Sequence, residues 1–74
     1  MQYSVVLIPE EDGRYTLTVP ALLGCTTFGD TTDEALDNAR DAIQQYVASL
    51  EAHGKTIPRE CGPAEVATVE VQWA

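Results

Sequence analysis

Acidic residues are the residues of this sequence best suited to catalysis or binding, and many of them fall in one short window. Five lie between residues 30 and 41, where Arg40 is the only cation: Asp30, Asp33, Glu34, Asp37 and Asp41. Converging carboxylates can hold two metal ions about 4 Å apart for phosphodiester cleavage. Carboxylates on one surface can instead attract a basic protein.

A nuclease is the function that the sequence supports least. Such a site needs several converging carboxylates, one of them usually on the first strand, and residues 3–8 (YSVVLI) contain none. We therefore expect no enzymatic activity. Asp33 and Glu34 are explained by a helix start, where negative charge is stabilising. Asp30, Asp37 and Asp41 remain as candidate partner-binding residues.

Cysteine and histidine do not add a catalytic or metal site. Cys25 and Cys61 form no CxxC motif, and with His53 alone they cannot supply the four ligands of an ordinary zinc site. We expect Cys25 to be a small buried apolar residue and Cys61 a loop thiol, with a disulfide left open. His53, near the end of a predicted helix, suits the helix dipole. No cofactor is expected.

The charge balance narrows the range of partners. Twelve acidic and four basic residues give a net charge of −8, which repels phosphate and anionic lipid. We expect no direct nucleic-acid binding and no membrane association. The sequence also lacks the basic and apolar segments of a signal peptide, so a cytoplasmic location is expected.

The elements that must position these residues begin with three strands. Residues 3–8 form a strand that is apolar on both faces from Val5 to Ile8, which predicts cover on both sides. Asp12-Gly13 predicts a hairpin turn, and residues 14–19 then alternate as a second strand. A compact turn over residues 20–24 leads to a third strand at residues 25–28, and it places Leu22 and Leu23 on an exposed turn.

A long helix and a last strand follow. Thr31 and Glu34 match a capping box, so the helix is expected from Thr32 to His53 with Gly54 beyond it. Its buried stripe is predicted as Leu36, Ala39, Ile43, Tyr46 or Val47, and Leu50. Residues 55–64 read as a loop. Residues 66–73 alternate as a fourth strand, with Ala67, Val69, Val71 and Trp73 on one face.

The predicted fold is α+β with one domain over residues 1–74. A right-handed crossover would return the fourth strand parallel to the first, which gives the element order β-β-β-α-β and the sheet order 3-2-1-4. One helix covers only one face of that sheet, and a chain of 74 residues has a thin core. A homo-oligomer, dimer or tetramer, is therefore expected. Its candidate interface residues are Val5, Val6, Leu7, Ile8, Val69, Val71 and Trp73.

Three segments resemble the HicB family of bacterial and archaeal antitoxins. They are residues 15–25 with Tyr15, Val19-Pro20, Leu22 and Gly24-Cys25; residues 29–35 with Gly29-Asp30-Thr31 and Glu34-Ala35; and residues 54–58 with Gly54 and Ile57-Pro58. The resemblance implies an N-terminal HicB domain with a partial ribonuclease H-like fold. It also implies a partner, HicA, a small basic toxin that cleaves mRNA and whose surface HicB masks.

Two functions follow from this resemblance. The first is an antitoxin-type binding domain, with Leu22, Leu23, Asp30, Asp37 and Asp41 contacting a HicA-like toxin. The second is a standalone oligomeric HicB-like domain with a structural or regulatory role and no toxin. Many HicB proteins carry a further C-terminal DNA-binding domain, and residues 1–74 contain no segment of that kind. We therefore do not expect autorepression by this chain alone.

Overall fold

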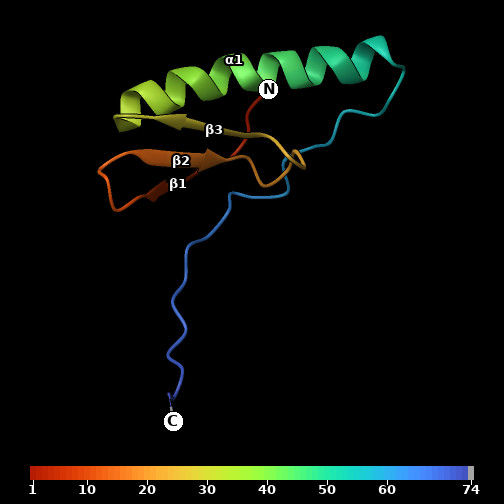
Figure 1. The fold of residues 1–74 in the computed structure, drawn as a ribbon. Helices are drawn as coiled ribbons and strands as arrows, with labels where there is room; N and C mark the ends of the chain where they lie inside the picture. Colours follow the sequence, from red (N-terminus) through yellow and green to blue (C-terminus); the bar gives the residue numbers. More distant parts are fainter. Residues whose placement is uncertain (74) are drawn as a thin grey trace.

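The computed structural model describes residues 1–73 and contains three strands followed by one helix (Figure 1). Strand β1 spans Val6–Pro9, β2 spans Tyr15–Thr18, β3 spans Thr26–Gly29, and the helix α1 spans Thr32–Ala52. The strands form an antiparallel sheet in the order β1-β2-β3. Helix α1 lies across one face of that sheet (Figure 1). The predicted α+β class and the antiparallel meander are confirmed.

The two turns of the meander form where glycine permits a left-handed backbone. Gly13 has φ +88° in the β1-β2 hairpin, and Gly24 has φ +79° before β3. In the second turn, the amide of Leu22 donates to the carbonyl of Val19, and the amide of Cys25 donates to that of Leu22. These bonds fold residues 19–25 into a compact connection, as the Pro20 and Gly24 positions predict.

Helix α1 begins and ends where the sequence predicts. The Thr31 hydroxyl accepts a hydrogen bond from the amide of Glu34 at 3.1 Å, and the Glu34 carboxylate accepts one from the amide of Asp30 at 3.1 Å. The return bond of the capping box therefore reaches one residue further back than Thr31. Gly54, at φ +66°, follows the C-cap residue His53.

A small core lies between α1 and the sheet. Its buried residues are Leu17, Val19, Leu22, Cys25, Ala35 and Ala39. The burial of Ala35 and Ala39 shows that the face of α1 against the sheet is lined by small side chains. Leu36, predicted in the buried stripe, is 40% exposed because it lies to one side of that face. Ile43, Tyr46, Val47 and Leu50 are half-buried.

The strand register separates the two faces of the sheet. Leu7 pairs with Leu17, which is fully buried, so this row faces α1. Ile8 pairs with Thr16, and Thr16 with Phe28, so this row faces the other way. Ile8 and Phe28 are 44% and 61% exposed. Within residues 1–73 no other element covers this face, so the predicted cover on both sides of β1 is present only on the helix side.

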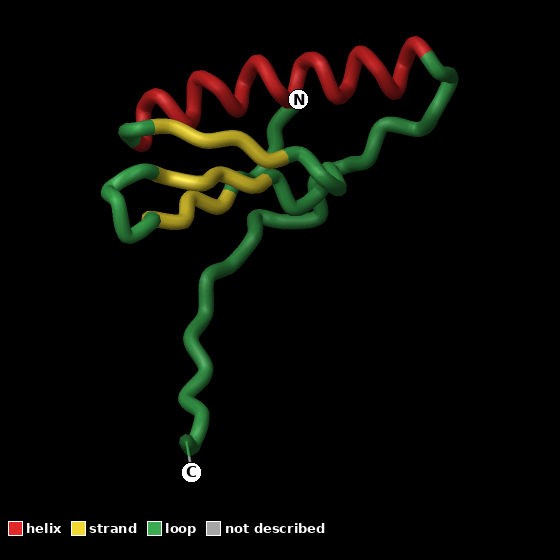
Figure 2. Tube along the Cα trace, in the orientation of Figure 1, coloured by secondary structure: helices red, strands yellow, loops and turns green. Residues whose placement is uncertain are grey.

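The predicted fourth strand is not formed in the single chain. Residues 66–73 have no strand structure, and Figure 2 shows them as a loop running away from the body. The order 3-2-1-4 is therefore not observed; the described residues give only β1-β2-β3. The alternating pattern indicates that a segment can join a sheet. It does not specify the sheet edge, or the chain, with which the segment pairs.

The loop after α1 returns to the start of β1 before the chain leaves the body. The Tyr3 hydroxyl donates to the carbonyl of Pro58 at 2.6 Å, and the amide of Ser4 donates to the Glu60 carboxylate at 2.9 Å. The amide of Ala64 donates to the Ser4 hydroxyl at 3.1 Å. Residues 58–64 are thereby fixed beside residues 3–4, and residues 65–73 extend beyond this point (Figure 1).

Residues 1–73 contain neither a membrane-spanning helix nor a metal-binding cluster. No helix there is long and apolar enough to cross a membrane. The His, Cys, Asp and Glu side chains of this part of the chain form no group of three placed to hold a metal ion.

Candidate partner-binding surface

The turn before β3 places two adjacent leucines in opposite environments. Leu22 is 1% exposed and belongs to the core, whereas Leu23 is 91% exposed. The prediction that both lie on the surface is wrong for Leu22, because the folded turn directs its side chain inward between β2 and α1. The Tyr46 hydroxyl donates to the carbonyl of Leu23 at 2.7 Å and fixes the turn against α1. Leu23 is thus a well-positioned exposed apolar side chain.

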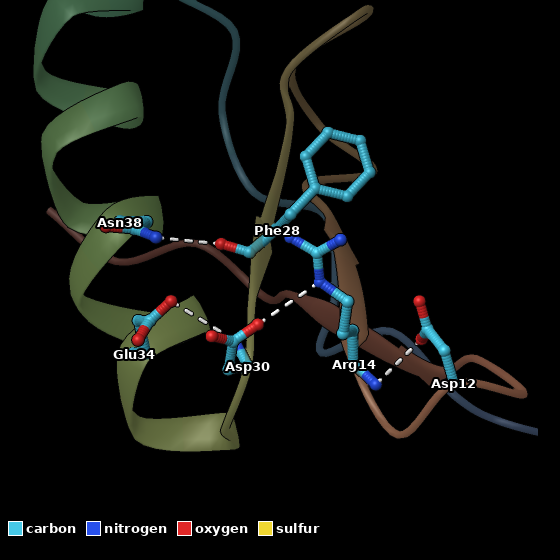
Figure 3. Close-up of polar contacts among 6 residues, drawn as sticks. All are labelled: Asp12, Arg14, Phe28, Asp30, Glu34 and Asn38. Carbon is cyan, nitrogen blue, oxygen red and sulfur yellow. Dashed lines mark hydrogen bonds and ion pairs between the residues drawn. The ribbon is translucent and has the colours of Figure 1, made fainter.

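Asp30 lies at the corner where β3 passes into α1. Its carboxylate accepts a hydrogen bond from Nε of Arg14 at 3.1 Å, across the sheet from β2 (Figure 3). The Arg14 and Asp30 side chains are 64% and 69% exposed. An ion pair this exposed contributes about 0.2–1 kcal/mol at most, so it orders Asp30 more than it stabilises the fold.

Phe28 is a surface residue that the sequence patterns did not identify. It lies on β3 beside Asp30, and its carbonyl accepts a hydrogen bond from the Asn38 side chain at 2.7 Å (Figure 3). Gly29 is buried against Ala35, so closely that a Cβ at position 29 would collide with the Ala35 backbone. Since neighbouring residues of a strand face opposite ways, Phe28 must point away from α1. Gly29 before the capping box was the sequence feature that could have revealed this.

Asp37 and Asp41 lie one helical turn apart on α1. Both are exposed, and Asp37 forms a loose ion pair with Arg40 at 3.5 Å. No ion pair is found for Asp41 in the part of the chain that the structure describes. Asn38 and Tyr46 reach β3 and its preceding turn, and position 41 follows 38 by three residues, so Asp41 lies on the same side of α1.

These exposed residues lie on the turn before β3, on β3 and its end, and on the exposed part of α1. We call them the acidic flank: Leu23, Phe28, Asp30, Asp37 and Asp41. This arrangement offers no nucleophile and no general base positioned by a third group, but it can bind a basic surface.

The opposite side of α1 borders a groove. Its volume is about 1130 Å³, and it runs between α1 and residues 1–5, with Glu60, Gly62 and Pro63 at one end. Its walls include the apolar residues Val5, Leu36, Ile43 and Val47, and its rim includes the polar residues Arg40, Gln44, Glu51 and Glu60. We call this surface the apolar groove. It takes its lining from α1 residues that the sequence pattern predicted as core.

The seven predicted interface residues are distributed among three environments. Val5 and Leu7 pack against the core, while Val6 and Ile8 lie on the open face of the sheet. Val69, Val71 and Trp73 lie on the extended segment and are 83%, 75% and 92% exposed. The structure does not bring these residues together within one chain.

The cysteines and the histidine occupy the expected positions. Cys25 is buried and free, and its burial raises the pKa of the thiol. Cys61 is an exposed thiol in the loop after α1. Nδ1 of His53 lies 2.7 Å from the carbonyl of Ser49 at the end of the helix.

The architecture and the sequence together define the protein class. Residues 3–74 match the family described as HicB_like antitoxin of bacterial toxin-antitoxin system. This match spans nearly the whole chain, so the chain belongs to the HicB-like antitoxin family. The resemblance found in the three sequence segments is confirmed.

Individual relatives agree with this assignment. A UPF0150 protein of Thermoplasma acidophilum is 48% identical over 60 residues, which cover 81% of this chain and 87% of that protein. Antitoxin HicB 1 of Photorhabdus laumondii is 44% identical over 43 residues, which cover 58% of this chain and 28% of that longer protein. Some relatives are thus of similar length, and others carry further sequence.

A solved structure has the same fold. The N-terminal domain of the Burkholderia pseudomallei antitoxin HicB superposes with a TM-score of 0.75 at 29% identity. The match covers 84% of this chain and 73% of that one. The meander of three strands and the long helix are therefore the HicB N-terminal architecture.

Proposed function

We propose that this protein is an antitoxin that neutralises a small basic HicA-like toxin in the cytoplasm by binding it and masking its RNA-cleaving surface. The acidic flank is the proposed contact surface. No covalent step is required, because burying a toxin's active surface is sufficient to prevent substrate access. Membership of the HicB-like antitoxin family supports a toxin partner in general terms.

The observation that carries the proposal is the exposure of Leu23 on a turn that is fixed against α1. Leu23 is 91% exposed although its backbone is fixed by Tyr46, so the fold gains nothing from a leucine there. A leucine exposed on a fixed turn can serve as an apolar anchor in a pocket of a partner. Negative charge on α1 and at the end of β3 comes from Asp30, Asp37 and Asp41. This charge would steer a basic partner into the correct orientation.

The test uses the intact protein and the HicA-like toxin encoded beside its gene. Co-expression should restore growth that the toxin inhibits, and the two proteins should co-purify at moderate salt. Asp41→Lys should weaken the complex about tenfold at low salt and less at high salt, because screening removes most of a surface charge effect.

Glu65→Lys is the matched control. Glu65 is an exposed acid of the segment after α1 and is not part of the acidic flank, so the same change in net charge should leave binding within about twofold. Equal losses in both variants would show that only net charge matters and would remove the acidic flank from the proposal. Absence of any complex with the adjacent toxin would overturn the proposed function.

The second candidate is a standalone oligomeric domain with a structural or regulatory role. It is favoured by the exposed apolar side chains of residues 66–73, which serve no purpose in an isolated chain. A stable homo-oligomer from a gene without a neighbouring toxin gene would support this function over the first.

A further inference from the structure

The most prominent unexplained features are an apolar segment without a partner and an apolar groove without an occupant. Val66, Val69, Val71 and Trp73 are 87%, 83%, 75% and 92% exposed on a segment that leaves the body. The apolar groove lies between α1 and residues 1–5. From these two features we infer that residues 66–73 of one chain occupy the apolar groove of a second copy and extend its sheet beside β1, in a reciprocal exchange that forms a closed dimer.

The dimensions of the segment and the groove agree. Residues 66–73, as a strand at about 3.3 Å per residue, span about 26 Å. Helix α1 has 21 residues and at about 1.5 Å per residue is about 31 Å long. The segment can therefore follow most of the helix, and Val69, Val71 and Trp73 would all face it from one side of the strand.

The edge of β1 is the open edge of the sheet. The amide of Glu10 donates to the carbonyl of Arg14 at 2.8 Å, and Ile8 and Val6 lie two and four residues earlier in the same register. Their amides therefore face β2, and those of Leu7 and Val5 point outward. At the other edge, α1 already approaches through the bond from Asn38 to the carbonyl of Phe28. An added strand is consequently expected at β1.

The sequence pattern of α1 also favours an occupant in the apolar groove. Leu36, Ile43 and Val47 have the spacing of a buried stripe, yet in the single chain they line the wall of an open groove. The small residues Ala35 and Ala39 already satisfy the contact of α1 with its own sheet. A strand bearing two valines and a tryptophan would bury the remaining wall.

The position of the segment's first residues favours a second copy over the chain's own segment. Residues 58–64 are fixed by Tyr3 and Ser4 at the end of the groove, and the chain then departs from the body (Figure 1). Two copies related by a twofold axis would exchange two segments for two grooves, so that no apolar edge remains exposed. This dimer leaves Leu23, Asp30 and Asp41 of the acidic flank free, so we expect it to form without affecting toxin binding.

Sedimentation velocity of the intact protein without a toxin tests the dimer. The wild type should sediment as a dimer at about 50 µM, as expected for burial of two apolar segments. Val71→Lys should weaken dimerisation about 100-fold, since a lysine would be buried against the groove wall. Glu70→Lys is the matched control, because position 70 faces the other side of the same strand, and it should remain a dimer.

Both variants should keep the helical circular dichroism signal of the wild type, because residues 66–73 do not pack against their own chain's core. A monomeric wild type, or equal sedimentation of Val71→Lys and Glu70→Lys, would overturn the inference. Asp41→Lys should remain dimeric, so a failure of toxin binding and a failure of dimerisation are separately visible.

Cross-linking distinguishes the two possible owners of the segment. In a Cys61→Ser background, Val71→Cys and Val47→Cys are made on separate chains, mixed and oxidised. A covalent dimer that contains one chain of each kind is expected. Failure to form this mixed dimer would overturn the inference. So would a single chain carrying both substitutions that forms an internal disulfide and stays monomeric, because its own segment would then occupy the groove.

Discussion

The two sides of α1 differ in whether contacts within the same chain cover them. On the acidic flank, Asn38 and Tyr46 donate hydrogen bonds to the carbonyls of Phe28 and Leu23 and hold the helix against β3. On the other side, the helix presents Leu36, Ile43 and Val47 to a groove. The first side is closed and polar, which suits a partner that binds and leaves. The second is open and apolar, which suits a permanent partner.

The largest effect should come from the turn that supports the acidic flank. Leu22→Ala should lower the free energy of unfolding by about 2–5 kcal/mol, since it leaves a cavity in a thin core. Leu23→Ala should change it by less than about 0.5 kcal/mol but weaken toxin binding. Urea unfolding of both variants, with toxin binding of the second, checks this. Similar stability losses would contradict the assignment of Leu23 to a binding surface.

A pair of adjacent residues on α1 sharpens the comparison further. Leu36→Lys should weaken dimerisation about 100-fold, which is about 2.7 kcal/mol, and leave toxin binding unchanged. Asp37→Lys should do the reverse, with a loss of about tenfold in toxin binding and an intact dimer. Sedimentation and toxin titration of both variants give the four values needed. If either substitution altered both properties alike, the two sides would not be independent.

A smaller effect is expected where the acidic flank begins. Thr31→Ala removes the hydroxyl that accepts the amide of Glu34 and should destabilise the protein by about 1 kcal/mol. Thr31→Ser keeps the acceptor and should restore most of this loss. Thermal unfolding of the two variants measures the difference. An alanine variant as stable as the serine variant would show that this cap contributes nothing.

The smallest effect concerns the attachment beside the apolar groove. Hydrogen bonds from the amides of Ser4 and Gly62 hold the pKa of the Glu60 carboxyl below its ordinary value. Because the folded-state pKa is lowered, the stabilisation is complete above the unfolded-state pKa and is lost as pH falls through the folded-state pKa. The Ser4 amide resonance should report a midpoint below the ordinary pKa of a glutamate carboxyl.

Glu60→Gln provides the control for that titration. The amide side chain keeps an acceptor for Ser4 but has no proton to gain, so the Ser4 resonance should no longer shift over the acidic range. A midpoint at or above the ordinary value in the wild type would show that the Glu60 contact does not persist in solution.

Local features of the sequence predicted most of the fold correctly. Pro20 with Gly24, the Asp12-Gly13 pair and the Thr31 capping box each act within a few residues, so the turns and both ends of α1 were predicted to within about two residues. Patterns that depend on distant contacts were less reliable. The burial of Leu22 depends on how the turn folds under α1, and Phe28 points outward because Gly29 packs against Ala35.

The amino-acid sequence by itself determined the family, the order of the first four elements and the negative charge. Each of these follows from residue type or short-range spacing. Only the tertiary structure decided that Leu23 and not Leu22 is exposed, that α1 covers β3 and leaves a groove beside residues 1–5, and that residues 66–73 extend away from the body. The physical reason is that burial depends on three-dimensional contacts between distant segments, which a local pattern does not specify.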